Sequence, residues 1–117
     1  MNNINKSDAK RSLKEIEPIL PEIKKILRKI YADRLVDVFL YGSFAKNKAG
    51  KDSDIDIAVV LNNKVNQSRE IDRTCDALYE LMLRTGELIS VFPVSSKEIS
   101  ISNWPLYHHI ANEGIRL

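Results

Sequence analysis

The sequence has few of the features that mark several large classes of protein. Its 117 residues include one cysteine, which excludes an intramolecular disulfide and a cysteine-based zinc site. No apolar run approaches the ~20 residues that a membrane-spanning helix needs. Residues 1–6 have neither an apolar core nor a small-residue cleavage site, so we expect no signal peptide. These absences together predict a soluble cytoplasmic protein that does not bind membranes.

An excess of charge of one sign is also missing. Eighteen Lys and Arg against sixteen Asp and Glu give a net charge of +2, which is too small to indicate a nucleic-acid-binding surface. The two histidines, His108 and His109, are adjacent, and neither has an acidic or cysteine partner at the spacing of a metal site. The remaining composition, 44% hydrophobic and 29% charged, is ordinary for one domain over residues 1–117.

The first part of the chain is predicted to be helix interrupted by proline. Apolar residues recur at spacings of three and four over residues 7–31, which is the period of an amphipathic helix. Pro18 and Pro21 each lack a backbone donor and clash with the preceding turn inside a helix. We therefore expect a short leading helix that is broken near Glu17 and a second helix from about Ile19.

Strands and helices alternate through the rest of the chain. β-branched and aromatic residues predict strands over residues 35–41, 55–61 and 88–92. A short helix is expected directly after the first strand. Helical patterns run from about residue 66 or 68 to residue 84, and from about residue 103 to residue 114. The fold class is therefore α/β (α+β), a small mixed sheet covered by helices in the order α-β-α-β-α-β-α.

Single residues within these elements carry their own expectations. Cys75 lies on the apolar stripe of the third helix, so it is interpreted as a small buried residue and not as a reactive thiol. Pro93 is expected to stop the third strand, because proline cannot donate to a strand ladder. Trp104 is interpreted as an apolar anchor for the last helix.

Residues suited to phosphate binding lie at the end of the first predicted strand. Gly42 and Ser43 follow that strand and open a short helical segment, so free backbone amides would point outward at this turn. The glycine lets an anion approach the backbone closely, and the Ser43 hydroxyl can donate a further hydrogen bond. A Ser43 that merely caps the helix is the alternative.

Two carboxylates lie at the start of the second strand. Asp54 and Asp56 are separated by one residue, so both project from one face of the strand, while Ile55 and Ile57 point into the core. Neighbouring carboxylates repel each other, and a divalent cation such as Mg²⁺ shared with substrate phosphates removes that repulsion. A calcium loop starting at Asp52 is excluded, because Ile57 replaces the required glycine and Asn63 the required glutamate.

The motif resembles that of a known family. Gly42-Ser43, ten residues and Asp54-Ile55-Asp56 match the Gly-Ser-x10-Asp-x-Asp signature of the DNA polymerase β-like nucleotidyltransferase superfamily. Within it, residues 41–46 and 52–59 are similar to the two blocks of the minimal MNT nucleotidyltransferases, which are encoded beside HEPN-domain toxins. The resemblance covers nearly the whole chain and implies the nucleotidyltransferase fold.

The resemblance also implies a reaction and a set of site residues. A nucleoside monophosphate, AMP when ATP is the NTP substrate, would pass to a hydroxyl of a partner protein, the HEPN-domain toxin, with release of pyrophosphate. Asp54 and Asp56 would be the catalytic ligands of Mg²⁺, in a site able to hold two ions. Gly42 and Ser43 would hold the β- and γ-phosphates, and Lys46 would add a positive charge. The family leaves open whether copies of the chain form a homo-oligomer.

Two departures from the family pattern define an alternative. Active members supply a third carboxylate from the following strand, where this chain has Ser90. Glu87, the nearest acid, falls on the opposite face by alternation. Lys46 also replaces the usual arginine. The leading hypothesis is an enzyme that acts as an antitoxin by modifying the toxin, and the alternative is a nucleotide-binding module that neutralises the toxin by direct contact. Small-molecule nucleotidyltransferases are disfavoured by the short chain, and nucleic-acid polymerases by the near-neutral charge.

Overall fold

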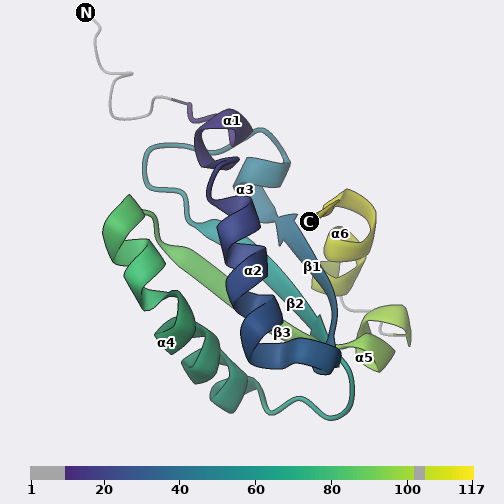
Figure 1. The fold of residues 1–117 in the computed structure, drawn as a ribbon. Helices are drawn as coiled ribbons and strands as arrows, with labels where there is room; N and C mark the ends of the chain where they lie inside the picture. Colours follow the sequence, from purple (N-terminus) through teal and green to yellow (C-terminus); the bar gives the residue numbers. More distant parts are fainter. Residues whose placement is uncertain (1–9, 102–104) are drawn as a thin grey trace, which may run out of the picture.

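A computed structural model describes residues 10–101 and 105–117 as a single layer of sheet with helices on both of its faces (Figure 1). No helix in these two ranges is both long and apolar enough to cross a bilayer. The elements, in chain order, are α1 (Leu13–Ile16), α2 (Leu20–Tyr31), the 3-10 turn η2 (Ala32–Arg34), β1 (Leu35–Tyr41), α3 (Gly42–Ala45), β2 (Ile55–Leu61), α4 (Gln67–Thr85), β3 (Ile89–Ser95), α5 (Ser96–Ile101), α6 (Pro105–Glu113) and β4 (Ile115–Arg116).

The sheet is mixed, as the sequence predicts. Its strand order is β3-β2-β1-β4, with β1 antiparallel to both of its neighbours and β2 parallel to β3. The first two strands have the bounds expected from their β-branched and aromatic runs. The helix break is confirmed as well, because α1 ends at Ile16 and α2 begins at Leu20. This arrangement places the end of β1 beside the start of β2, and the motif residues lie there.

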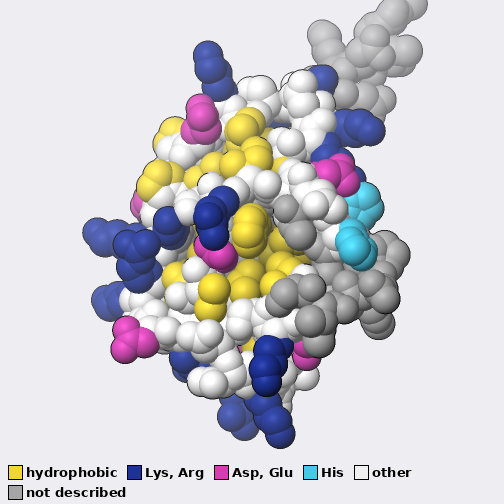
Figure 2. Space-filling model, turned by 90° about the vertical axis from the view of Figure 1, so that its right-hand side faces the viewer, with side chains coloured by type: hydrophobic (Ala, Val, Ile, Leu, Met, Phe, Trp, Pro, Cys, Tyr) yellow, Lys and Arg dark blue, Asp and Glu magenta, His cyan; other side chains and the backbone are white. Residues whose placement is uncertain are grey.

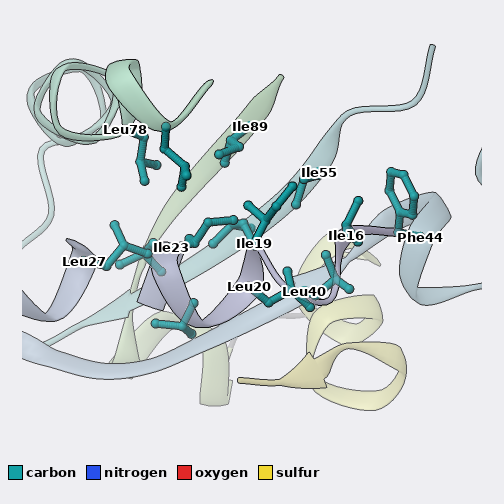
Figure 3. Close-up of a cluster of buried hydrophobic side chains, with 14 of the residues drawn as sticks. Ile16, Ile19, Leu20, Ile23, Leu27, Leu40, Phe44, Ile55, Leu78 and Ile89 are labelled. Atoms are coloured by element: carbon teal, nitrogen blue, oxygen red, sulfur yellow. The ribbon is translucent and has the colours of Figure 1, made fainter. Parts of the chain in front are cut away.

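The main hydrophobic core lies between one face of the sheet and helices α2 and α4. Side chains of a strand alternate between its two faces, so Ile55, Ile57, Val59 and Leu61 all point into this core. Figure 3 shows the residues of α1 and α2 meeting Leu40, Ile55 and Ile89 of the strands and Leu78 of α4. The intervening positions of β2 therefore face the other side of the sheet, which α5 and α6 cover.

A smaller cluster occupies that second face. Val60 and Val94 are buried there, with Phe39, Phe92 and Ile99 of α5 packed against them. The element α5 and the two-residue strand β4 were not predicted, because neither has a periodic pattern long enough to read from sequence. The expectation for Trp104 falls outside the described residues.

The prediction that Pro93 stops the third strand is wrong. β3 runs on to Ser95, and Pro93 lies in register with Val59 of β2. The strand is at the edge of the sheet, where a residue without an amide hydrogen costs no ladder bond if its backbone faces outward. Its carbonyl oxygen accepts from Gln67 Nε2 at 3.0 Å. Pro93 is therefore compatible with the strand.

The prediction that Cys75 is buried is also wrong, since the thiol is exposed. The buried face of α4 instead carries Glu70, Thr74, Leu78 and Leu81. Two of these residues are polar, so a pattern search for apolar residues assigns the helix a rotated face. The burial of Glu70 is compensated by contacts with Tyr31, Arg34 and Arg73.

Candidate active site

The centre of the site is a close contact between Gly42 and Asp56. Tyr41, the last residue of β1, pairs with Asp56 on β2, and the chain then turns into α3 through Gly42 with φ +76°. A Cβ added at Gly42 would overlap with Oδ2 of Asp56 and lie 3.0 Å from its Cγ. Only glycine fits here, for steric and conformational reasons together. The backbone that is suited to phosphate thus lies directly against a carboxylate.

The two motif carboxylates are close enough to influence each other. The pKa of the Asp56 carboxyl is raised, first because the group is partly buried and second because the negative charge of Asp54 is nearby. Tyr41 has its pKa raised to about 12 by burial and by the charge of Asp56. Neither aspartate forms a salt bridge within residues 10–101 and 105–117. The site therefore holds negative charge that the described protein does not neutralise.

Ser90 occupies the position next to Asp56 on the adjacent strand. The two residues are paired in the parallel register of β2 and β3, so their side chains emerge on the same face. The described residues contain no group of three His, Cys, Asp or Glu side chains that could hold a metal ion. The described part of the site thus offers two carboxylates and a serine hydroxyl.

Glu87 is engaged elsewhere, with Arg11. Its two carboxylate oxygens accept from Arg11 Nη1 and Nη2 at 3.0 and 2.5 Å, a two-pronged pair in which both side chains are largely buried. The backbone N–H of Arg11 donates to the Ala49 carbonyl oxygen at 2.9 Å. Arg11 thus joins the segment before α1 to the loop before β2 and, through Glu87, to the segment between α4 and β3. Glu87 holds the loop in place and does not face the motif carboxylates.

Ser43 and Lys46 lie in and after the single turn of α3. Ser43 is half-buried, and its carbonyl oxygen accepts from the Lys48 amide at 2.8 Å, which tightens the chain after the turn. Lys46 is exposed, and its Nζ lies 3.9 Å from Oε1 of Glu113 on α6. The structure thus brings Gly42, Asp54 and Asp56 together and places Lys46 at the border of the site.

A cavity of about 190 Å³ adjoins Gly42 and holds residues that the sequence analysis missed. Its lining comprises Tyr41, Gly42, Lys46, His109 and Glu113. His109 Nδ1 and Glu113 Oε2 are 2.5 Å apart, and this contact with His109 is the main reason that the pKa of Glu113 is lowered. His109 thus has an acidic partner one helical turn away, although no three such side chains among the described residues could hold a metal ion together. The spacing of four residues within a predicted helix was the available signal.

The surface around Lys46 and the cavity is seen from the side of the molecule that lies on the right in Figure 1. Figure 2 shows hydrophobic side chains gathered in the middle of that face, Lys and Arg side chains around them, and the two histidines together at one margin. The exposed histidine margin is reachable from solvent, and His109 connects it to the cavity beside Gly42. His109 is therefore both exposed and part of the cavity lining.

Comparisons with known proteins agree with this geometry. A family model described as a nucleotidyltransferase domain matches residues 20–104. Two curated proteins of Methanocaldococcus jannaschii, both named "Putative protein adenylyltransferase", are 30% and 28% identical to the chain over 93 and 100 residues. The first alignment covers 77% of this chain and 62% of the relative, and the second covers 84% and 93%. The chain thus spans less than two thirds of the first relative.

Solved structures share the fold. A crystal structure of a mutant of the toxin–antitoxin pair MntA–HpeT has a TM-score of 0.58 at 19% identity, covering 84% of this chain and 70% of that one. The cyclic dinucleotide synthase CdnE of Elizabethkingia meningoseptica, solved with GTP and Apcpp, has a TM-score of 0.55 at 19% identity, covering 79% and 42%. At these identities the likeness establishes the architecture alone.

Proposed function

Because the chain belongs to the nucleotidyltransferase-domain family, as a minimal member of it, we propose that it transfers AMP from ATP to a hydroxyl of a partner protein. The observation that carries the proposal is the contact of the Gly42 backbone with the Asp56 carboxylate, beside Asp54 and next to an open cavity. The acceptor oxygen attacks the α-phosphorus, the bond from that phosphorus to the bridging oxygen breaks, and pyrophosphate leaves with the electron pair. The hydroxyl proton passes to a base or to water.

The donor set fits Mg²⁺. Asp54 and Asp56 present hard oxygen atoms that pair with no cationic side chain in the described part of the chain. Mg²⁺ is commonly held by one or two carboxylates plus substrate phosphates. A bound magnesium ion would polarise the phosphoryl oxygens and neutralise charge on the leaving pyrophosphate. Binding of the cation would also stabilise the ionised form of Asp56 against the burial that raises its pKa.

The other motif residues bind and orient the nucleotide. Gly42 has no side chain to block a phosphate from its backbone, and the Ser43 hydroxyl donates a hydrogen bond to a phosphate oxygen. Lys46 exchanges its long contact with Glu113 for a phosphate of the triphosphate. A contact of 3.9 Å between exposed side chains contributes little free energy, so this exchange is not opposed by the resting structure.

The relatives support a proposal for the partner. The named activity of the curated relatives supports a protein acceptor, and the MntA–HpeT structure supports a toxin as that acceptor. We propose a cytoplasmic antitoxin, one domain over residues 1–117, whose partner is a HEPN-domain toxin. The chain contributes the nucleotide site, and the partner contributes the acceptor hydroxyl.

The test is transfer of label from α-³²P-ATP to a purified HEPN-domain partner, with and without Mg²⁺. Wild-type chain should label the partner in the presence of Mg²⁺, and EDTA should prevent it. The double variant Asp54→Asn/Asp56→Asn should leave the partner unlabelled. Equal labelling by the wild-type chain and the double variant, or none by either, contradicts the enzymatic proposal.

Ser90 favours the alternative, a module that neutralises the toxin by direct contact. The third carboxylate expected beside Asp56 is a serine, so nucleotide binding could persist without efficient transfer. Growth rescue of cells that express the toxin separates the two functions. If Asp54→Asn/Asp56→Asn rescues growth as well as the wild-type chain does, the direct-contact function is correct. If the variant binds the toxin but fails to rescue, the enzymatic function is correct.

A further inference from the structure

An exposed row of apolar side chains runs along the outer face of α4. Ile71, Tyr79 and Leu83 are 44%, 58% and 67% exposed, and Cys75 is exposed between them. The four residues are spaced four apart, so they form one continuous row along the helix. Leu88, which is 60% exposed, follows the helix just before β3. We call these five residues the α4 row.

The row borders a shallow groove of about 490 Å³. The groove lies where the end of α4 approaches the start of β3, and it includes the exposed side of Leu88. Among the large hydrophobic residues that the structure describes as exposed, all but Val36 belong to the row. Grouped exposure of this kind marks interaction surfaces, whereas scattered exposure does not. The groove is lined by Cys75, Tyr79, Met82, Leu83, Gly86, Glu87 and Leu88.

A row of acidic side chains lies directly beside the α4 row. Asp72, Asp76 and Glu80 each follow a residue of the apolar row by one position, which places them about 100° further around the helix. All three are exposed, and none forms a salt bridge within the ranges 10–101 and 105–117. The next position on this side is Arg84, which follows Leu83 and pairs with Glu22 of α2 at 2.7 Å. The surface therefore combines apolar area with negative charge along one side as far as Glu80.

The groove ends beside the strand β2, which carries the motif carboxylates on the opposite face of the sheet. The Leu88 carbonyl oxygen accepts from the Ile55 backbone N–H at 2.9 Å, and Ile55 lies between Asp54 and Asp56. Figure 1 shows α4 alongside β3 at the left of the sheet, with its outer side away from α2. A ligand on the α4 row thus reaches, through Leu88, the strand that carries the proposed metal ligands.

We propose that the α4 row is the docking site for an amphipathic helix of the acceptor protein, whose apolar face is bordered by Lys or Arg. The identification of the partner as the acceptor rests on the proposed function. A helix with apolar residues at i, i+3, i+4 and i+7 fits a groove that follows another helix. Basic residues on its border meet Asp72, Asp76 and Glu80, which fixes the direction in which it lies. A segment of the acceptor that flanks the docked helix can then pass around the edge strand β3 to the nucleotide on the other face of the sheet.

Charge argues against two other occupants. In a two-fold antiparallel pair of α4 helices, the same side of each helix meets its symmetry mate, so the acidic rows of two copies would lie together and repel. An anionic bilayer is repelled by the same acidic row. A basic helix is the occupant that satisfies both the apolar and the charged parts of the surface.

The test uses ¹⁵N-labelled full chain and two synthetic helical peptides of about five turns. Both peptides carry leucine on one face, and they differ only in having lysine or glutamate beside it. The lysine peptide should shift the amide signals of the α4 row and bind about tenfold more tightly than the glutamate peptide. The difference should shrink in about 0.5 M salt, because screening weakens exposed charge pairs.

Substitutions test whether the lysine peptide binds at the α4 row. Tyr79→Ser/Leu83→Ser should weaken the lysine peptide about tenfold, whereas Val36→Ser, a matched change at an exposed apolar residue of β1, should leave binding unchanged. Asp72→Asn/Asp76→Asn/Glu80→Gln should remove the preference for lysine. In the labelling assay, Leu83→Ser should raise the KM for the acceptor and leave the KM for ATP and kcat unchanged.

Several outcomes overturn the proposal. These are signal shifts outside α4 and Leu88, equal affinity for the two peptides, dimerisation of the chain through α4, and binding to phosphatidylserine vesicles that Leu83→Ser abolishes. Failure here is distinct from failure of the proposed function. If the wild-type chain transfers no label but binds the lysine peptide on the α4 row, the enzymatic function is wrong and the docking surface is right.

Discussion

Two groups of carboxylates in this molecule differ in whether the protein supplies partners for their negative charge. Glu70 on α4 is buried, and its oxygens accept from the Tyr31 hydroxyl at 2.8 Å and lie 3.2 Å from Arg73 Nε and 3.5 Å from Arg34 Nη1. Asp54 and Asp56 are half-buried and have no such cation among the residues that the structure describes. One carboxylate is neutralised by the fold, and the other two are left charged.

The difference separates a structural group from a functional one. Burying a carboxylate is costly unless it is paired and hydrogen-bonded, and Glu70 meets that condition with groups from α2, η2 and α4. Asp56 does not, and its raised pKa records the cost. Partly buried carboxylates without a cationic partner, such as Asp56, are typical of a functional site that binds a cation from solution.

The largest effect should come from Asp56→Asn. Loss of a metal-binding carboxylate should lower transfer about 10³-fold, which corresponds to about 4 kcal/mol of transition-state stabilisation. The same change should raise the free energy of unfolding by about 1 kcal/mol, because it removes a partly buried charge. Rates of label transfer and urea unfolding measure the two effects. Asp52→Asn, an exposed neighbour, is the control for both.

Glu70→Ala should have the opposite signature. It leaves the buried Tyr31 hydroxyl without its acceptor and removes two ion pairs, so we expect a loss of about 3 kcal/mol of unfolding free energy. Transfer per folded molecule should be unchanged. Glu80→Ala, at an exposed position of the same helix, should cost less than about 0.5 kcal/mol. A catalytic defect in Glu70→Ala at temperatures where the chain is folded would contradict the contrast.

Glu87→Gln tests whether the nearest acid to Ser90 is structural. The two-pronged pair with Arg11 is largely buried, so its loss should cost about 1 to 2 kcal/mol of unfolding free energy. Label transfer should remain within about twofold of wild type, since the carboxylate faces Arg11 and not Asp56. A collapse of transfer to the level of Asp56→Asn would show that Glu87 is the third catalytic acid.

The smallest effect is a dependence on pH. The pKa of Asp56 in the folded chain lies above its ordinary value of 3.8, so the folded state favours the protonated carboxyl. The stabilisation is complete below pH 3.8 and is lost as pH rises through the folded-state pKa. The stability advantage of Asp56→Asn over wild type should therefore grow as pH rises through that range and then level off. A constant difference between pH 3 and pH 8 in thermal unfolding would contradict this.

The sequence predicts those parts of the fold whose pattern is local. The runs at 35–41 and 55–61 are β-branched or aromatic throughout, and spacing alone places Asp54 and Asp56 together. Features decided by tertiary contacts escaped prediction. Cys75 is exposed because Glu70 and Thr74 take the buried face of α4, and Glu70 is stable there only through partners on other elements. The role of Glu87 likewise depends on Arg11, 76 residues away.

The outer edge of β3 has a consequence for how this chain meets others. Pro93 supplies no amide hydrogen there, and its carbonyl oxygen is already occupied by Gln67. A foreign strand seeking to extend the sheet would find neither a donor nor a free acceptor at the middle of that edge. Backbone-mediated strand addition, the route by which exposed edges aggregate, is therefore disfavoured at Pro93 of β3. Another protein that binds at this edge would therefore be recognised mainly by side chains, which distinguish between partners better than backbone groups do.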